Sequence, residues 1–141
     1  MAPMRNLQPK PTLALLRANP KALFIDCRSD SEYFMIGHCV VKHADGSEVR
    51  PELVMWSDEL RMETNPDFVA QVTALSSSKN QTVVIICRSG RRSALAGHAL
   101  KAAGFTDVVN VLHGFEGDRN DIDQRSTVNG WRFDGLDWEQ L

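Results

Sequence analysis

Apolar runs typical of buried strands alternate along the chain with a segment of helical composition. Thr82–Ile86 is β-branched and continuously apolar, as expected of a central parallel strand. Leu23–Ile25 is a shorter apolar run, and the valines within 108–111 form a third. Between Thr82–Ile86 and the valines within 108–111, residues 93–103 are alanine-rich and predict a helix that Gly104 ends. The order strand, turn, helix, strand predicts an α/β fold with a central, mostly parallel sheet flanked by helices.

Four other segments have weaker signals. Residues 1–11 hold three prolines and little apolar content, and they predict a flexible, extended tail. Helix-start residues predict a helix over 12–19, a helical turn over 29–34, and a further helix that begins at Asn65–Pro66. The intervening residues 42–66 mix charges, glycine and proline, which is typical of a connecting segment.

Size and charge narrow the class of protein. The chain has 141 residues, with 16 basic and 18 acidic side chains and a net charge of −2. This length fits one domain, which we place at 12–141. We expect no nucleic-acid partner, because neutralising phosphates requires a basic face. Residues 116–141 hold seven acids against three arginines, and they predict a surface tail whose aromatic residues Trp131 and Trp138 dock back onto the domain.

Signals for secretion or membrane insertion are missing from the sequence. The longest apolar run near the start, Leu13–Leu16, is shorter than the roughly 7–15 residues of a secretory signal. The longest run anywhere, Val83–Cys87, is far shorter than the roughly 20 residues that span a bilayer. We therefore expect a cytoplasmic protein without membrane contact, whose three cysteines stay reduced.

One cysteine stands where the predicted central strand enters a short loop. The loop residues are Cys87, Arg88, Ser89, Gly90, Arg91, Arg92 and Ser93. Backbone N–H groups of such a loop form a cradle for anions, and the N-terminus of the following helix adds partial positive charge. With the three guanidinium groups these features favour the thiolate, so we expect the pKa of Cys87 to lie below its ordinary value. The loop predicts a nucleophile for an anionic substrate with an electrophilic centre.

This loop resembles the active-site loop of rhodanese-type sulfurtransferases, and other motifs follow in the family's order. They are Asp26-x-Arg28, Glu32-Tyr33, Gly37-His38, Gly104-Phe105, Asn110-Val111, Gly114-Phe115 and Asn129-Gly130-Trp131 with Gly135-Leu136 and Trp138. The resemblance covers residues 12–138 and implies a single-domain, three-layer rhodanese-like fold. After Gly37-His38 the family continues Ile-Pro-Gly-Ala, whereas this chain has Cys39–Lys42, so the structure of residues 39–64 is left open.

The resemblance also implies a reaction by double displacement. The Cys87 thiolate takes the outer sulfur of thiosulfate, sulfite leaves, and Cys87 holds a persulfide. A thiophilic acceptor then takes the sulfur; cyanide, a thiol and a cysteine of a partner protein are the expected classes. No metal or organic cofactor is implied, because the sulfur is carried covalently on Cys87.

The residues implied to bind substrate are Arg88, Ser89, Gly90, Arg91, Arg92 and Ser93. Arg88 and Arg91 are expected to contact the sulfonate end. Arg92 either does the same or pairs with an acid such as Asp26 or Glu32. Ser93 is expected to cap the helix and to touch the Cys87 sulfur. Asp26 and Arg28 are expected to form a structural charge network beside the site.

Two other functions stay open. One is a persulfide carrier or interaction module that receives sulfur from a donor protein and acts poorly on free thiosulfate. The other is a cysteine-dependent phosphatase or arsenate reductase. Phosphatases of related fold use Cys-x5-Arg, whereas only four residues separate Cys87 from Arg92 here and residue 93 is serine. The shorter loop suits the smaller sulfane sulfur.

Several other residues have both a functional and a structural interpretation. Cys27 is expected at the same sheet rim as Cys87, as a resolving or relay thiol or as a small strand residue. Cys39 follows His38 without the spacing of a metal site, and both are expected to be structural. His113 is a candidate for the rim of the site. Met55 and Trp56 predict an exposed apolar patch for docking an acceptor.

Overall fold

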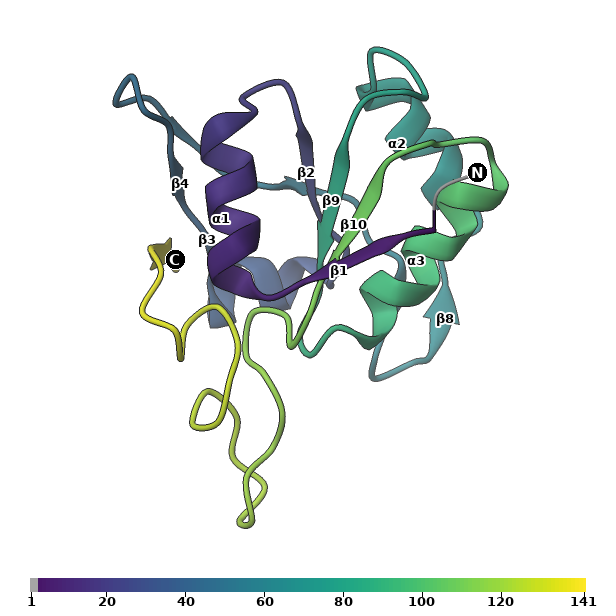
Figure 1. Cartoon of the computed structure of the whole chain (residues 1–141). Coiled ribbons are helices and arrows are strands. Elements are labelled where there is room, and N and C mark those ends of the chain that lie inside the picture. The colour runs from purple at the N-terminus through teal and green to yellow at the C-terminus, as the bar shows by residue number, and fades with distance from the viewer. Residues whose placement is uncertain (1–2) are drawn as a thin grey trace.

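A five-stranded parallel sheet forms the centre of the computed structural model, which describes residues 3–141 (Figure 1). The strands lie side by side in the order β1 (Arg5–Leu7), β10 (Val108–Val111), β9 (Val83–Ile86), β2 (Leu23–Asp26) and β6 (Glu52–Leu53). All neighbouring pairs are parallel. Every residue of β9 is buried, as its continuous apolar run predicted. The α/β class with a parallel sheet is confirmed.

Helices cover both faces of this sheet. Helix α1 (Pro9–Ala18) covers one face, and α2 (Phe68–Leu75) and α3 (Arg91–Ala102) cover the other (Figure 1). Alternate side chains of β9 pack against the helices on opposite faces of the sheet, because successive residues of a strand point to opposite faces. Val84 and Ile86 pack in the cluster that includes Leu16 of α1, while Val83 and Ile85 pack with Phe68 and Leu100. The three-layer arrangement is therefore also confirmed.

The segment predicted as a flexible tail belongs to the fold. Strand β1 is the edge of the sheet and pairs with β10, with Arg5 opposite Val109. Helix α1 already begins at Pro9, where proline is tolerated because the first N–H groups of a helix have no partner within it. Thr12 lies inside the helix, and its hydroxyl donates to the Gln8 carbonyl at 2.8 Å. The predicted boundary at residue 12 is therefore wrong, and Met1–Ala2 lie outside the described residues.

The segment after β2 consists of a helical turn and short strand pairs. The one-turn π-helix η1 (Glu32–Ile36) ends at Gly37, as predicted. Ser29 and Glu32 cap it reciprocally, since each side chain accepts the other's backbone N–H. The strands that follow are β3 (His38–Cys39), β4 (Val41–Lys42), β5 (Glu48–Val49), β7 (Ser57–Asp58) and β8 (Glu63–Thr64). β4 pairs with β5, and β7 with β8, as two antiparallel hairpins.

The C-terminal segment docks onto the α1 side of the sheet through its aromatic residues. Trp131 is fully buried in the same cluster as Leu16, and its indole N–H donates to the Asp137 carbonyl at 2.8 Å. Strand β11 (Trp138–Glu139) pairs antiparallel with β3. The predicted docking of 116–141 is confirmed. None of the helices within residues 3–141 is long and apolar enough to cross a membrane.

A turn after β10 fixes the beginning of the loop that follows β9. The backbone N–H groups of Phe115 and Glu116 donate to the carbonyls of Cys87 and Arg88 at 2.8 and 2.9 Å. Gly114 has a φ of +61°, and a Cβ atom there would lie 2.4 Å from the Cys87 carbonyl oxygen. Only glycine lets the two backbones approach this closely.

Gly114→Ala is therefore expected to destabilise the protein more than an alanine substitution at another glycine that has a positive φ but has room for the added Cβ atom. Gly135, at φ +77° with no atom within 4 Å of the added Cβ, is the matched control. We expect Gly135→Ala to lose about 1–2 kcal/mol of unfolding free energy. Gly114→Ala should lose about 2 kcal/mol beyond that, because the backbones must separate. Urea unfolding measures both, and equal losses contradict the packing described.

Candidate active site

Cys87 follows the last residue of β9 and lies at the N-terminal end of α3. Gly90 precedes the helix with a φ of +98°, a left-handed conformation that glycine adopts without strain. Because of this turn, α3 begins at Arg91, two residues earlier than the sequence predicted. The Cys87 sulfur therefore lies close to the first turn of the helix, where free N–H groups and the helix dipole favour negative charge.

Three hydrogen-bonding groups of the loop converge on the Cys87 sulfur. The N–H of Gly90 lies 3.1 Å from Sγ, the N–H of Ser93 lies 3.3 Å away, and the Ser93 hydroxyl lies 3.2 Å away. Ser93 is not the helix cap, because Gly90 occupies that position. The Ser93 hydroxyl donates its single proton to Asn110 Oδ1, and the Asn110 amide donates to the Gly90 carbonyl at 3.3 Å. Asn110 thus braces both residues, a role signalled only by one polar residue in a valine strand.

The Cys27 thiol is a further neighbour of the Cys87 sulfur, and it is among the groups that lower the pKa of Cys87 while its own pKa is raised. Cys27 is fully buried and follows β2, the strand beside β9. Its backbone N–H donates to the Ile86 carbonyl at 3.0 Å, which extends the pairing of the two strands to the cysteines. The sequence left two roles open for Cys27, and the structure places it in the same buried cluster as the candidate nucleophile.

The environment stabilises the thiolate of Cys87 despite its burial. Burial alone raises the pKa of a thiol, but hydrogen bonds from Cys27 and Ser93 and the positive charge of Arg92 outweigh it. The net result lowers the pKa of Cys87 to about 5. Cys87 is therefore ionised at neutral pH, the direction that the loop composition predicted.

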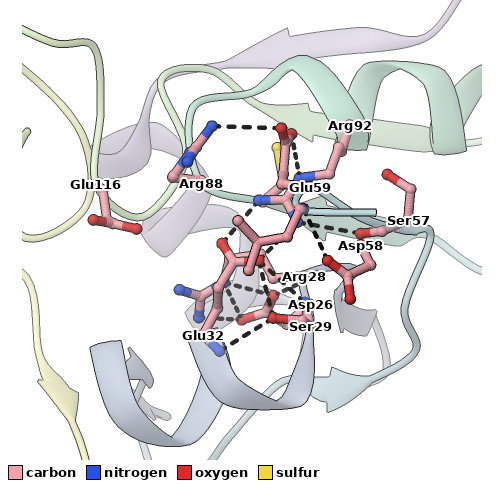
Figure 2. A network of polar contacts seen from close by, with 12 residues as sticks. Asp26, Arg28, Ser29, Glu32, Ser57, Asp58, Glu59, Arg88, Arg92 and Glu116 are labelled. Atoms are coloured by element: carbon pink, nitrogen blue, oxygen red, sulfur yellow. Dashed lines mark hydrogen bonds and ion pairs between the residues drawn. The ribbon is translucent and has the colours of Figure 1, made fainter. Parts of the chain in front are cut away.

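Arg92 belongs to an ion-pair network with Glu32 and Glu59 (Figure 2). Its side chain is 4% exposed, with two N–H groups bonded to the Glu32 carboxylate at 2.8 Å each and Nε 2.9 Å from Glu59. Of the two roles left open for Arg92, the pairing with Glu32 is confirmed, and contact with a substrate stays a prediction. Burial opposes both charges, but the pairing raises the pKa of Arg92 and lowers that of Glu32. Arg92 acts on Cys87 through its charge.

Asp26 and Arg28 form the structural pair that the sequence predicted. Both side chains are fully buried, with Arg28 Nη2 2.7 Å from Asp26 Oδ2 and Nε 2.9 Å from Oδ1 (Figure 2). Arg28 also donates to the Gly37 carbonyl at 2.6 Å and lies over the Phe115 ring, 4.6 Å from its centroid. This pair joins the end of β2 to the end of η1 and to the turn after β10.

Arg88 and Arg91 are the loop arginines that solvent can reach. The Arg88 side chain is 32% exposed and lies 3.6 Å from Glu59. Its Nε is buried and has no hydrogen-bond partner within residues 3–141. Arg91 is exposed in the first turn of α3, and Ser89 lies half-buried between the two. These positions suit an anion that approaches the loop from outside.

A cleft of about 440 Å³ adjoins Arg88. Its lining includes Glu59 and Leu60 from the β7–β8 hairpin, Met35 and Ile36 from η1, and Arg125. Glu59 was not among the residues expected at the site. Nothing in the sequence marks it, because it is one acid among several in a charged, irregular segment.

The apolar side chains exposed near this cleft differ from those predicted. Trp56 packs edge-on against Phe68, with ring centroids 5.3 Å apart, and belongs to the margin of the core. The expectation of an exposed patch at Met55 and Trp56 is therefore wrong. Leu60 and Met62, at the tip of the β7–β8 hairpin, are instead 96% and 79% exposed.

The remaining candidates take structural positions. Cys39 is buried in the cluster on the opposite side of the sheet from Cys87. His38 bonds the Tyr33 carbonyl and the Glu139 carboxylate, at 2.9 Å each, which joins η1 to the C-terminal strand. His113 lies 3.7 Å from Asp118. Over residues 3–141 no group of three histidine, cysteine or acidic side chains is gathered to hold a metal ion.

Removing the Cys27 thiol should make Cys87 harder to ionise. In Cys27→Ala the thiolate loses a charge-assisted hydrogen bond of about 1.5 kcal/mol, so the pKa of Cys87 should rise by roughly one unit. Cys27→Ser keeps a donor and should shift it less. The pH dependence of Cys87 alkylation by iodoacetamide reads out the midpoint. The same midpoint in wild type and both variants contradicts the role of the Cys27 contact.

Comparison with known proteins agrees with this geometry. The family model of the rhodanese-like domain matches residues 10–121. The crystal structure of Rv0390 from M. tuberculosis superposes with a TM-score of 0.83 at 30% identity, with all of both chains covered. The polysulfide-sulfur transferase homodimer of Wolinella succinogenes has a TM-score of 0.61 at 22% identity, over 98% of this chain and 80% of that one.

A curated relative is also similar over most of the chain. An uncharacterized protein of Rickettsia conorii is 26% identical over 126 residues, which are 89% of each chain. The family model covers most of the chain and includes the strand, loop and helix that surround Cys87. The chain therefore belongs to the rhodanese-like domain family.

Proposed function

We propose that this protein is a sulfurtransferase that moves sulfane sulfur from thiosulfate to a thiophilic acceptor through a persulfide on Cys87. The observation that carries the proposal is the ionised Cys87 sulfur, facing the N–H groups of Gly90 and Ser93 at the start of α3. A thiolate in a site built for negative charge is suited to attack an anion that other nucleophiles would repel. The structural neighbour from Wolinella succinogenes is a polysulfide-sulfur transferase.

In the first half-reaction the Cys87 thiolate attacks the outer sulfur of thiosulfate. A bond forms between Sγ and that sulfur, the sulfur–sulfur bond of thiosulfate breaks, and sulfite leaves with the bonding electron pair. Arg88 and Arg91 are the accessible cations for the sulfonate oxygens. The charge stays balanced, because a dianion and a thiolate become a persulfide anion and a dianion.

In the second half-reaction an acceptor nucleophile attacks the outer sulfur of the persulfide. The sulfur passes to cyanide, a thiol or a cysteine of a partner protein, and the Cys87 thiolate is regenerated. The donors that hold the starting thiolate also stabilise it as leaving group, so one cradle serves both steps.

A second candidate function is favoured by Glu59. Its carboxylate lies 3.6 Å from Arg88 and 2.9 Å from Arg92, so it places a negative charge where a small dianion would bind (Figure 2). This arrangement favours a persulfide carrier that is loaded by a donor protein and uses free thiosulfate poorly. The chemistry at Cys87 is the same in both functions.

A steady-state assay with thiosulfate and cyanide tests the main proposal. We expect thiocyanate formation by the wild type, none by Cys87→Ser, and a mass gain of about 32 Da at Cys87 after thiosulfate alone, which is one sulfur atom. No turnover together with no mass gain contradicts transfer from thiosulfate. Loading only by a persulfide donor supports the carrier, and release of phosphate from a phosphoester supports the phosphatase alternative.

Neutralising Glu59 should improve the use of thiosulfate. In Glu59→Gln an oxygen is kept for Arg92, while the charge that faces the dianion is removed. We expect the KM for thiosulfate to fall roughly fivefold, about 1 kcal/mol, with little change in kcat. Glu63→Gln, in β8 of the same hairpin, is the matched control. An unchanged or higher KM in Glu59→Gln contradicts a screening role for this carboxylate.

A further inference from the structure

Two cysteines meet at the carboxyl ends of adjacent parallel strands. In β2 and β9, Ile25 is opposite Ile85 and Asp26 is opposite Ile86, so Cys27 and Cys87 are the next pair. The two cysteines share a face of the sheet with Ile25 and Ile85, and all four lie in the cluster beneath α2 and α3. The pairing of the strands therefore places the two thiols against each other.

The spacing at this position matches what a disulfide needs. Neighbouring strands lie about 4.8 Å apart, and the Cα atoms of a disulfide are usually about 4.4–6.8 Å apart. The two cysteines pack in one buried cluster, and their residues are 0% and 1% exposed. No external thiol has access to Cys27, because the residue is fully buried.

We propose that Cys27 is an internal resolving thiol that attacks the Cys87 sulfur of the persulfide, releases hydrogen sulfide and leaves a Cys27–Cys87 disulfide. This inference rests on the proposed persulfide on Cys87. The bond from Cys87 to the outer sulfur breaks as the bond between the two cysteines forms. The outer sulfur leaves with the electron pair and takes up the proton that Cys27 loses. Cys27 is oxidised, and the outer sulfur is reduced to sulfide.

The two sulfur atoms of the persulfide are reached from different sides. Cys27 lies within the hydrophobic cluster and contacts the sulfur that belongs to Cys87. An external acceptor arrives from the loop side, where Arg88 and Arg91 meet solvent, and it takes the outer sulfur. Transfer to an acceptor and release as sulfide are thus competing fates of one intermediate.

The ionisation state of Cys27 determines how fast Cys27 attacks the persulfide. Burial, and then the hydrogen bond and negative charge of Cys87, raise the pKa of Cys27 well above its ordinary value. Cys27 is therefore mainly a thiol at neutral pH and reacts slowly. An acceptor that arrives promptly takes the sulfur, and a persulfide left without one decays to sulfide. A reducing thiol from solution then restores the enzyme by opening the disulfide.

Intact-mass measurement after loading tests the inference. Wild type, Cys27→Ser and Cys39→Ser are loaded with thiosulfate, desalted and incubated without acceptor, and released sulfide is assayed. In wild type and Cys39→Ser we expect the gain of about 32 Da to give way to a species lighter than reduced protein by two hydrogens. One sulfide should be released per disulfide, faster at higher pH, and peptide mapping should find Cys27 joined to Cys87. Cys27→Ser should keep the added sulfur.

The outcomes separate this inference from the proposed function. A persulfide that persists equally in wild type and Cys27→Ser overturns the resolving role and leaves sulfur transfer intact. Absence of the added sulfur in Cys27→Ser, with no linked peptide in wild type, overturns both. If Cys27→Ser does not fold, the linked peptide and the sulfide released by the wild type decide the question, and their absence overturns the resolving role.

Discussion

A negative charge at the buried end of the central strand is the constraint on which the site depends. A thiolate so nearly excluded from water is unfavourable unless nearby donors and charges replace the solvent. Here the replacements come from three elements: the first turn of α3, the adjacent strand β2 through Cys27, and the buried charge of Arg92. Gly90 makes the arrangement possible, because its left-handed backbone brings the N-terminus of α3 onto the sulfur.

Two buried ion pairs hold these elements in place. Asp26–Arg28 links the end of β2 to η1, and Glu32–Arg92 links η1 to the first turn of α3 (Figure 2). Burying such pairs costs desolvation that their attraction only partly returns, so they contribute more to position than to stability. Their benefit is geometric, since each fixes a chain segment that borders Cys87.

The sequence was most informative where local signals and tertiary environment agree. The apolar run of β9, the helix that ends before Gly104 and the Cys87 loop all have strong local patterns, and each is present in the structure. The edge strand β1 has only three residues and an exposed face, so no periodicity marks it. Helix α3 begins early because of a backbone conformation at Gly90 that composition does not reveal.

Long-range contacts account for the other differences. Arg92 forms ion pairs with Glu32 and Glu59, which are distant along the chain, so local sequence could not show which partner it takes. The contact between Cys27 and Cys87 depends on which strands are neighbours, and the topology rather than local sequence determines that. Trp56 is apolar in a charged segment, which suits a docking patch and a core margin equally well.

The ionisation of Cys87 in the resting protein tests the central claim most directly. Carbon-13 NMR of protein labelled at the cysteine Cβ atoms reports the three thiols separately, with Cys87→Ser to assign the signal. We expect the Cys87 resonance to titrate with a midpoint of about 5. The resonances of Cys27 and Cys39 should stay in the thiol position through neutral pH, because burial raises the pKa of both. A Cys87 resonance that also stays in the thiol position through neutral pH would contradict a stabilised thiolate at Cys87.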